Sequence, residues 1–498
     1  MKKIWGFFLP LAALALIAGT ATVQPATDAI AAAPGELDGL EYVSLGDSYS
    51  AGFGLDPYST ETPFVRDPNG CYQATANYPH NVAGALGLEL TDQTCSGAVT
   101  ANIGYPDGAN IPLPPASPPL PALTTGPVLQ TVLPGVTTPE LQGAALSPDT
   151  DVVTIGISGN DLGFGAIAIS CIREGLGAGT FPLYLALELS ITVDNCADYF
   201  GNNVTYPNAD LDVRLAEHIA PRIAATFQAV KEAAPNAQVF VVGYPQLTPG
   251  DATPACFSAP LTPDAVPFSP TDLDFLHNLE ASLDGALQEQ AADFGFHFVP
   301  TWTESADHTL CSDTPFIAGL TAYLNSDSPC QPNYIPVDNA VCVELGALHP
   351  NQSGVDLLTG ITTEAVNSAF FVTPATSSAT AGTAVGVTGG GFAPGEKVTL
   401  QLTGATTATL GSVTADSAGG FTTSVTLPAR TSAANYSLLG TGDASDRSFS
   451  SPLAVTAALA ATGSDVDALG VALSGASVLL LGGALFAVAS IRRRSRTS

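Results

Sequence analysis

Apolar residues between positions 37 and about 370 recur with two different spacings. Short, nearly continuous apolar runs occupy 40–45, 151–157, 238–244 and 296–300, the pattern of strands buried on both faces of a sheet. Between these runs, apolar residues repeat every three or four positions, as in helices that bury one face. Strands that alternate with helices predict one α/β domain with a parallel sheet in a three-layer α/β/α arrangement. The two helical stripes are Leu211, Leu215, Ile219, Ile223 and Phe227, and Leu273, Leu276, Leu279, Leu283 and Leu287.

The pattern changes at residue 371. Residues 371–457 are rich in Thr and Val, alternate between apolar and polar over short runs, and are punctuated by Gly and Pro. This predicts a small all-β sandwich. The stretch GGGFAPGEKVTLQL (389–402) resembles Ig-like modules of bacterial surface proteins. A glycan-binding role is one interpretation, but no aromatic platform is evident, so a spacer is favoured.

Residues 108–139 carry no charged side chain and contain many prolines. Proline at this density excludes a helix or a central strand, so an extended loop is expected. Such a segment is either a solvated linker or, given its Leu, Val and Ile residues, part of an apolar acyl-binding cleft. The apolar stretch 172–195 likewise favours a cleft that binds acyl chains.

Both ends of the chain have the features of export signals. Residues 1–31 begin with Lys2 and Lys3, continue with a short apolar run and end in small residues, as in a secretory signal peptide. Residues 459–498 contain LAATG, an apolar stretch long enough to span a bilayer as a transmembrane segment, and an arginine-rich tail. The pentapeptide resembles an LPxTG-type sortase signal. That resemblance implies cleavage between Thr462 and Gly463 and covalent attachment to peptidoglycan, with sortase as a partner and the cell wall as the location.

Charge and cysteine content limit the partners that the protein can bind and the role of its cysteines. The net charge of −31 makes nucleic acid an unsuitable partner. An even number of cysteines in an exported chain indicates disulfides rather than a metal site, since none forms a CxxC pair. Sequential pairing is one guess among the possible connectivities: Cys71–Cys95, Cys171–Cys196, Cys256–Cys311 and Cys330–Cys342.

The stretch SLGDSYSAGFG (44–54) follows the first strand-like run and places Ser48 at its carboxyl end. A surface turn would use the same residues, but open α/β sheets also hold their active sites at this edge. A nucleophilic serine needs a base, and His349 lies at a loop-to-helix junction in GALHPNQSG. Gly97 in TCSGAVT and Asn160 in TIGISGND lie where they could donate to an oxyanion. Of the other histidines, His218 and His277 fall in helical patterns, His297 in a strand-like run and His80 in a polar loop.

Four segments in order, GDSYS, CSGA, SGNDLGF and HPN, resemble the blocks of the SGNH (GDSL) hydrolases. Two further segments, VVGYPQL (241–247) and DHTLCSDTPFI (307–317), resemble the secreted, disulfide-bonded actinobacterial lipase/esterase branch of that family. The resemblance implies Ser48 as nucleophile and His349 as general base and then acid. It also implies an oxyanion hole formed by the backbone N–H groups of Ser48 and Gly97 and the Asn160 side chain. Asp47 would be structural, and no metal or cofactor is implied.

The sequence departs from the family where many members carry an aspartate three residues before the histidine, because that position is Gly346. Some relatives orient the histidine with a backbone carbonyl instead, and such a Ser-His dyad is expected here, with Glu344 as a less well-spaced alternative. A weakly active, degenerate site is a further possibility.

The sequence therefore predicts a wall-anchored serine esterase or lipase acting on carboxylic esters, with a lipid or an acylated carbohydrate as substrate. A carbohydrate O-acetyl esterase is the alternative within the same chemistry. A non-catalytic surface adhesin that retains the hydrolase fold is the alternative from another class.

Overall fold

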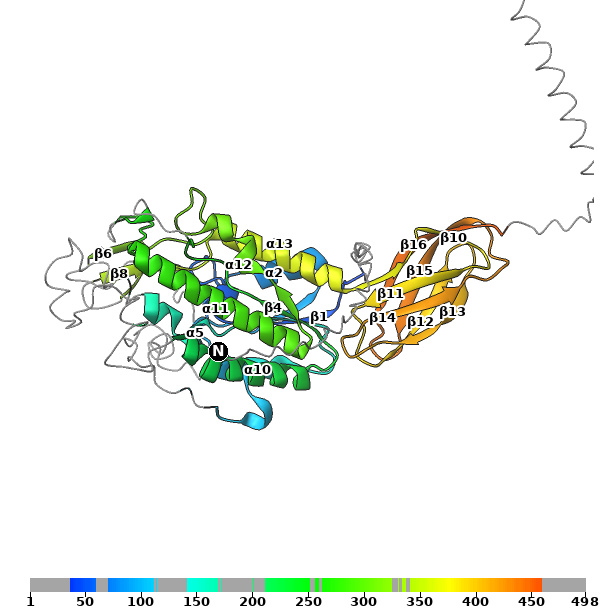
Figure 1. Ribbon diagram of the computed structural model, residues 1–498, viewed down its shortest axis with the longest axis horizontal. Coiled ribbons are helices and arrows are strands. Elements are labelled where there is room, and N and C mark those ends of the chain that lie inside the picture. The colour runs from blue at the N-terminus through cyan, green and yellow to red at the C-terminus, as the bar shows by residue number, and fades with distance from the viewer. Residues whose placement is uncertain are drawn as a thin grey trace, which may run out of the picture.

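The structure is a computed structural model that describes residues 36–59, 70–111, 113, 141–168, 171, 200, 211–250, 256–258, 262–324, 330, 334–336 and 341–458. An α/β part is followed by a β-sandwich that forms one end of an elongated molecule (Figure 1). A small three-stranded sheet, β6 to β8, lies at the other end.

A five-stranded parallel sheet is the centre of the α/β part, in the order β2-β1-β3-β4-β5. The four apolar runs predicted as strands are confirmed. The edge strand β2 was not predicted, because it has no continuous apolar run. It is only four residues long, with Glu and Asp at its ends. The strands are β1 (Glu41–Gly46), β2 (Glu89–Asp92), β3 (Val152–Gly156), β4 (Gln238–Val242) and β5 (His297–Val299).

Helices cover both faces of this sheet, as predicted. Alternate residues of a strand point to opposite faces, so Val43 and Leu45 of β1 pack with α10 and α11, whereas Tyr42 packs with α2 and α13. Both predicted leucine-rich stripes are buried in the first of these clusters. The longer helices are α2 (Tyr78–Leu86), α10 (Ala220–Ala233), α11 (Pro270–Phe294) and α13 (Gln352–Ala369).

Short helical turns lie mostly in the connections around the sheet. They include α1 and α5, which follow β1 and β3 directly. Their bounds are α1 (Ser48–Ala51), α3 (Thr100–Ile103), η1 (Pro106–Gly108), η2 (Gln142–Ala145), α5 (Gly159–Leu162), α9 (Leu211–Arg214), η3 (Leu215–Ile219), α12 (Thr301–Glu304) and η5 (Ala306–His308).

Disulfides join Cys71 to Cys95, Cys256 to Cys311 and Cys330 to Cys342. The last of them connects to the small sheet of β6 (Ala322–Leu324), β7 (Tyr334–Pro336) and β8 (Val341–Glu344). Cys171 is also disulfide-bonded. Cys196, its expected partner, lies outside the described residues.

Residues 371 to 456 form two packed sheets, one of five strands (β10-β16-β15-β12-β13) and one of three (β14-β11-β9). This is the all-β arrangement predicted, with inward-facing apolar residues alternating along β12 and β15. The strands are β9 (Phe371–Pro374), β10 (Ser378–Thr380), β11 (Ala384–Gly390), β12 (Lys397–Thr403), β13 (Ala408–Thr414), β14 (Phe421–Thr426), β15 (Ala434–Gly442) and β16 (Ser448–Thr456).

The sandwich is docked against the amino-terminal edge of the parallel sheet. Arg447 is 3% exposed and pairs with Asp151, at the start of β3, at 2.7 Å. Its guanidinium also donates to the carbonyl oxygens of Gly391 and Asn236. Glu36, ahead of β1, accepts hydrogen bonds from the backbone and side chain of Ser450. One apolar cluster runs through both parts, so the sandwich and the α/β part share a buried interface.

Several segments interpreted from the sequence lie outside the described residues: 1–31, most of 108–139, 172–195 and 459–498. Among the helices within the described ranges, none is both long and apolar enough to cross a membrane.

Candidate active site

The predicted nucleophile, Ser48, is the first residue of α1, immediately after the chain leaves β1. Gly46 ends the strand, and a side chain there would not fit, because its Cβ would lie 2.7 Å from the carbonyl oxygen of Gly156 in β3. Asp47 caps the helix by accepting a hydrogen bond from the Tyr49 N–H at 3.0 Å. This tight turn raises Ser48 at the carboxyl edge of the sheet, with 9% of its surface exposed.

The side chain of Gln142, in η2, holds the last residue of β1 by two hydrogen bonds. Its amide oxygen accepts from the Gly46 N–H at 2.8 Å, and its amide nitrogen donates to the Gly46 carbonyl at 2.9 Å. The side chain thus satisfies both backbone groups of the residue, as a neighbouring strand would. Sequence reasoning missed this residue, since nothing in its neighbourhood points to a contact with β1.

His349 lies beside Ser48, with its Nε2 2.8 Å from the serine Oγ. Its Nδ1 lies 2.9 Å from the Ala347 carbonyl oxygen. A carbonyl oxygen only accepts, so Nδ1 carries the proton and Nε2 is left as the acceptor for the serine hydroxyl. Burial lowers the pKa of His349 to about 4, although the bond to Ala347 opposes that shift. The imidazole is therefore neutral at physiological pH, as a general base must be.

Gly346 shows why an aspartate is absent at this position. Its φ of +86° favours glycine, and its backbone crosses that of Gly54, which follows the nucleophile helix. A Cβ at position 346 would lie 2.9 Å from the Gly54 Cα, closer than side chains normally approach backbone. Nδ1 of His349 is held by the Ala347 carbonyl rather than by Glu344.

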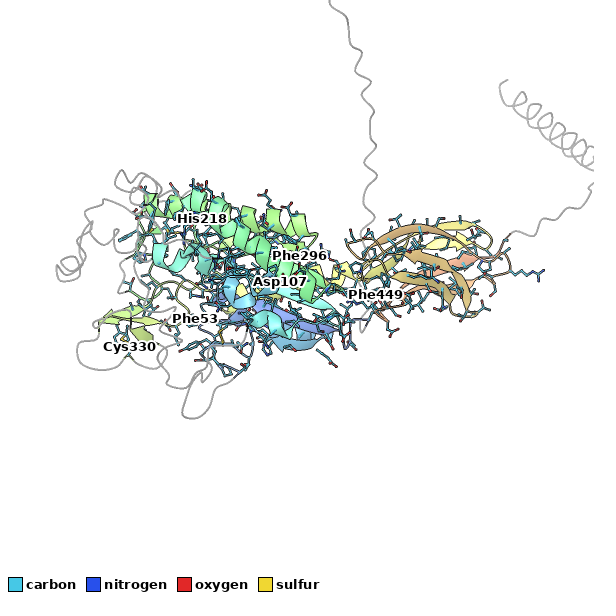
Figure 2. All side chains as sticks on the ribbon, turned by 90° about the horizontal axis from the view of Figure 1, so that it is seen from below. Phe53, Asp107, His218, Phe296, Cys330 and Phe449 are labelled. Carbon is cyan, nitrogen blue, oxygen red and sulfur yellow. A yellow bond between two sulfur atoms is a disulfide. The ribbon has the colours of Figure 1, made fainter. Side chains whose placement is uncertain are left out.

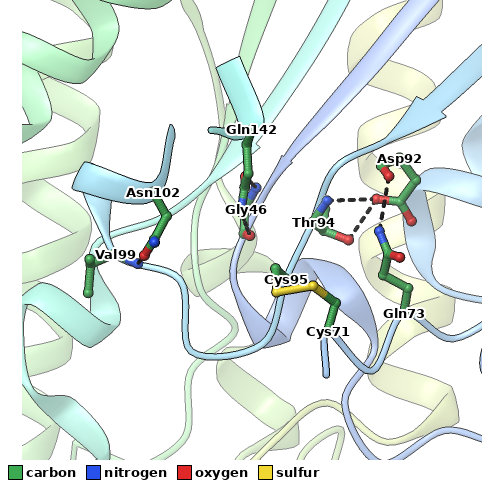
Figure 3. Close-up of a disulfide and its surroundings, with 9 residues drawn as sticks. All are labelled: Gly46, Cys71, Gln73, Asp92, Thr94, Cys95, Val99, Asn102 and Gln142. Carbon is green, nitrogen blue, oxygen red and sulfur yellow. Dashed lines mark hydrogen bonds between the residues drawn. A yellow bond between two sulfur atoms is a disulfide. The ribbon is translucent and has the colours of Figure 1, made fainter. Parts of the chain in front are cut away.

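Gly97 and Asn160 come together at the same sheet edge. Gly97 lies in a turn anchored by the Cys71–Cys95 disulfide, which Figure 3 shows. The Cys95 N–H donates to the Gly46 carbonyl at 3.0 Å. Asn160 is in α5, directly after β3, and one N–H of its amide donates to the Ala98 carbonyl at 3.0 Å. The amide has a second N–H, which is available for an oxyanion.

A buried ion pair supports both oxyanion candidates. Asp161 follows Asn160 and accepts from the backbone and hydroxyl of Thr100, at 2.8 and 2.6 Å, three residues after Gly97. Arg222 of α10 pairs with the same carboxylate at 2.9 Å and also donates to the Ile111 carbonyl. Both charged side chains are almost fully buried. Sequence reasoning missed this pair, which joins the asparagine turn to the glycine turn.

Asp47 faces the asparagine turn through Tyr244, whose hydroxyl donates to the Asp47 carboxylate at 2.5 Å and accepts from the Gly159 N–H at 2.9 Å. Burial raises the pKa of Asp47 to about 7, although the hydrogen bonds from Tyr244 and the Tyr49 N–H lower it. The Asp47 carboxylate thus joins the turn that carries Ser48 to the turn that carries Asn160.

Three of the other histidines bond to groups other than Ser48. His80 is in α2, bonded to Asn77, so its expected placement in a polar loop was wrong. His277 contacts the Thr248 carbonyl and His297 contacts Gln238. Within the ranges that the structure describes, no three His, Cys, Asp or Glu residues are grouped as a metal site would need.

Comparison with known proteins identifies the family of the chain. The model of the GDSL-like Lipase/Acylhydrolase family matches residues 44–357, and that of the macroglobulin-like domain matches residues 367–455. "Lipase 2" of Streptomyces coelicolor is 31% identical over 57% of this chain and 78% of its own length. "Esterase" of Streptomyces scabiei is 28% identical over 61% of this chain and 81% of its own length.

Among solved structures, an extracellular lipase of Streptomyces rimosus is similar with a TM-score of 0.41 and 22% sequence identity. That similarity covers 66% of this chain and 99% of the lipase. The family match spans most of the α/β part and all of the residues described above from Ser44 to His349. The chain belongs to the GDSL-like lipase/acylhydrolase family and is a carboxylic ester hydrolase of the esterase and lipase type.

Proposed function

We propose that the enzyme hydrolyses esters through an acyl-enzyme on Ser48, with His349 as its only partner in a Ser-His dyad. The observation that carries this proposal is the chain of contacts from Ser48 Oγ to His349 Nε2 at 2.8 Å and from His349 Nδ1 to the Ala347 carbonyl at 2.9 Å. The carbonyl holds the tautomer in which Nε2 accepts the serine proton, which is what the aspartate does in a triad.

In the proposed reaction, His349 Nε2 takes the hydroxyl proton as Ser48 Oγ attacks the ester carbonyl carbon. The oxyanion that forms is stabilised by the backbone N–H groups of Ser48 and Gly97 and by the free N–H of Asn160. The imidazolium then gives its proton to the departing alkoxide. Water, activated by the same imidazole, releases the acid and restores Ser48.

We favour acyl esters of lipids as the substrate class, because several relatives are named lipases. The apolar segment 108–139 supports the same preference. Carbohydrate O-acetyl esters remain the second candidate, because the same dyad acts on a short acyl group without any change in the chemistry.

The first test is the initial rate on p-nitrophenyl esters from acetate to palmitate, measured beside Ser48→Ala. We expect turnover to rise toward medium or long chains, and Ser48→Ala to lose about 10⁴-fold or more of it, since the hydroxyl is the nucleophile. Turnover of acetate alone would favour the O-acetyl esterase. Full activity in Ser48→Ala would contradict the mechanism, and no turnover on any ester would favour the adhesin.

We propose further that the enzyme is exported and attached to the cell wall. The support is the signal-peptide pattern in residues 1–31, the disulfides, and the order of LAATG, apolar stretch and basic tail at the other end. Attachment at Thr462 would place the sandwich between the wall and the hydrolase, because residue 462 follows β16 closely.

Thr462→Ala is expected to move the protein from the wall fraction to the membrane and culture fractions, because it removes the side chain that the LPxTG-type signal presents at the bond to be cleaved. The measurement is an immunoblot of muramidase-released wall, membrane and medium from the native host. Thr456→Ala, at the end of β16, is the matched control. Unchanged wall attachment of Thr462→Ala would argue against sortase processing.

A further inference from the structure

The peptide groups around Leu348 hold the histidine loop in an unusual conformation. Leu348 has a φ of +60°, a region that side chains larger than glycine rarely adopt. Its two flanking carbonyls have different partners. The Ala347 carbonyl, ahead of it, accepts from His349 Nδ1 at 2.9 Å, and the Leu348 carbonyl, after it, accepts from the Tyr49 hydroxyl at 2.6 Å. The conformation of Leu348 therefore determines where both carbonyls point.

Tyr49 is covalently next to the nucleophile, in the first turn of α1. Its ring packs beside the imidazole of His349, with ring centres 4.9 Å apart and planes at 38°. The edge of Tyr244 supports it from another side, at 5.1 Å and 86°. Phe53, one helical turn after Tyr49, packs against the imidazole at 5.0 Å. Figure 2 shows Phe53 in the α/β part, away from Phe449 of the sandwich.

The Tyr49 hydroxyl contributes something that the ring does not. The carbonyl that it bonds belongs to the same peptide group as the His349 N–H, so the hydroxyl fixes the peptide that directly precedes the histidine. Burial raises the pKa of Tyr49, and the nearby Glu280 and Asp47 raise it further, so the phenol remains a donor. A second bond, from the Leu348 N–H to the Ala318 carbonyl at 2.9 Å, holds the other side of the same residue.

We propose that Tyr49 is a positioning residue for His349, and that its hydroxyl bond to the Leu348 carbonyl does part of the work that a carboxylate at position 346 does elsewhere in the family. This rests on the proposed dyad. The Tyr49 hydroxyl bonds to a backbone carbonyl rather than to a reacting atom. It ties the backbone of the histidine loop to the helix that carries Ser48, so that nucleophile and base keep one separation through the reaction.

The test is Tyr49→Phe, which retains the ring and removes the hydroxyl. We expect kcat to fall about tenfold, the factor expected when one well-placed hydrogen bond is lost, with KM within about twofold of the parent value. The burst of p-nitrophenol per mole of enzyme should stay the same, because every molecule still carries an intact Ser48. Phosphonylation of Ser48 by an organophosphorus ester should slow by the same factor as kcat, since it needs the same serine activation.

Tyr436→Phe is the matched control. Its hydroxyl is bonded to Ser432 at 3.0 Å inside the sandwich, so the same chemical change there should leave kcat and the phosphonylation rate unchanged. Tyr49→Leu, which also removes the ring, should lower kcat further.

Parent-like kcat and phosphonylation in Tyr49→Phe, with a loss in Tyr49→Leu, would show that only the ring packing matters and would overturn the proposal. A fall in burst amplitude in proportion to kcat would mean fewer folded molecules, which also overturns it. If either of these results is obtained while Ser48→Ala is fully inactive, the Tyr49 proposal fails but the proposed Ser-His dyad stands. An active Ser48→Ala would instead remove the dyad on which the proposal rests.

Discussion

Replacing His349 by alanine is expected to lower kcat by roughly 10⁴- to 10⁶-fold, with KM for p-nitrophenyl esters nearly unchanged. Among the described residues, the imidazole is the basic group that bonds to the Ser48 hydroxyl, at 2.8 Å, and without it the serine must attack as a neutral alcohol. Loss of the base thus removes stabilisation of the transition state rather than binding of the ester. Steady-state kinetics and the rate of Ser48 phosphonylation both measure it.

His218→Ala is the control, because this partly exposed histidine lies in η3 and has no bond to Ser48 or His349 among the interactions of the described residues, so the variant should behave as the parent. A His349→Ala variant that retained more than about a tenth of the parent kcat would contradict the assignment of the base, because a general base contributes far more than that.

The same residue sets the expected pH dependence. Below its pKa the imidazole is protonated and cannot take the serine proton, so kcat/KM falls tenfold per pH unit there. Burial lowers this pKa to about 4, so kcat/KM should stay nearly constant down to about pH 5. Asp47, with a pKa of about 7, is the other titrating group at the turn, so the profile is also measured in Asp47→Asn. A midpoint near 6.5 in both proteins would contradict a buried neutral imidazole.

Arg222→Met is expected to lower the free energy of unfolding by about 3–5 kcal/mol, because it leaves a buried carboxylate without its cation. Asp161 is 1% exposed, and Arg222 is 5% exposed and bonded to it at 2.9 Å. Methionine fills a similar volume, so the loss reports the ion pair rather than a cavity. Chemical denaturation, followed by far-UV circular dichroism, measures the change.

Because Asp161 holds Thr100 and follows Asn160, the same variant should also lower kcat in the fraction that remains folded. Lys231→Met is the matched control, since Lys231 lies on the same helix but is exposed, and its ammonium donates to the Phe294 carbonyl at 2.8 Å. It should cost less than about 1 kcal/mol. Equal destabilisation by the two variants would argue against a special role for the buried pair.

The fold could be predicted in outline because its signals are local. Apolar runs of five to seven residues and stripes at helical spacing mark β1, β3, β4, α10 and α11 directly in the sequence. The short edge strand β2 escaped because an edge needs only one apolar face, and four residues are too few to show it. The docking of the sandwich escaped as well, since Arg447 and Asp151 are far apart in sequence and either alone looks like an ordinary surface charge.

The candidate site divides in the same way. Ser48, Gly97, Asn160 and His349 could be chosen because each stands in a short segment with its own composition, at a predicted strand or helix end. The residues that hold these side chains in place could not be predicted from the sequence. Gln142 reaches Gly46 over 96 residues and Tyr244 reaches Asp47 over 197. That a backbone carbonyl orients His349 was expected from the resemblance to the family, but every residue has a carbonyl, so the sequence could not identify the one of Ala347.

The crossing of Gly54 and Gly346 limits how this catalytic centre can evolve. A Cβ at either glycine would meet the backbone of the other, so a single codon change from Gly346 to aspartate would disrupt the loop before its carboxylate could act. Selection or laboratory evolution for a faster enzyme therefore has no one-step route to the aspartate that many members of the family resembled carry. Gains are more accessible in the residues that steady the histidine loop, and an aspartate becomes tolerable only after the segment following the nucleophile helix has been rebuilt.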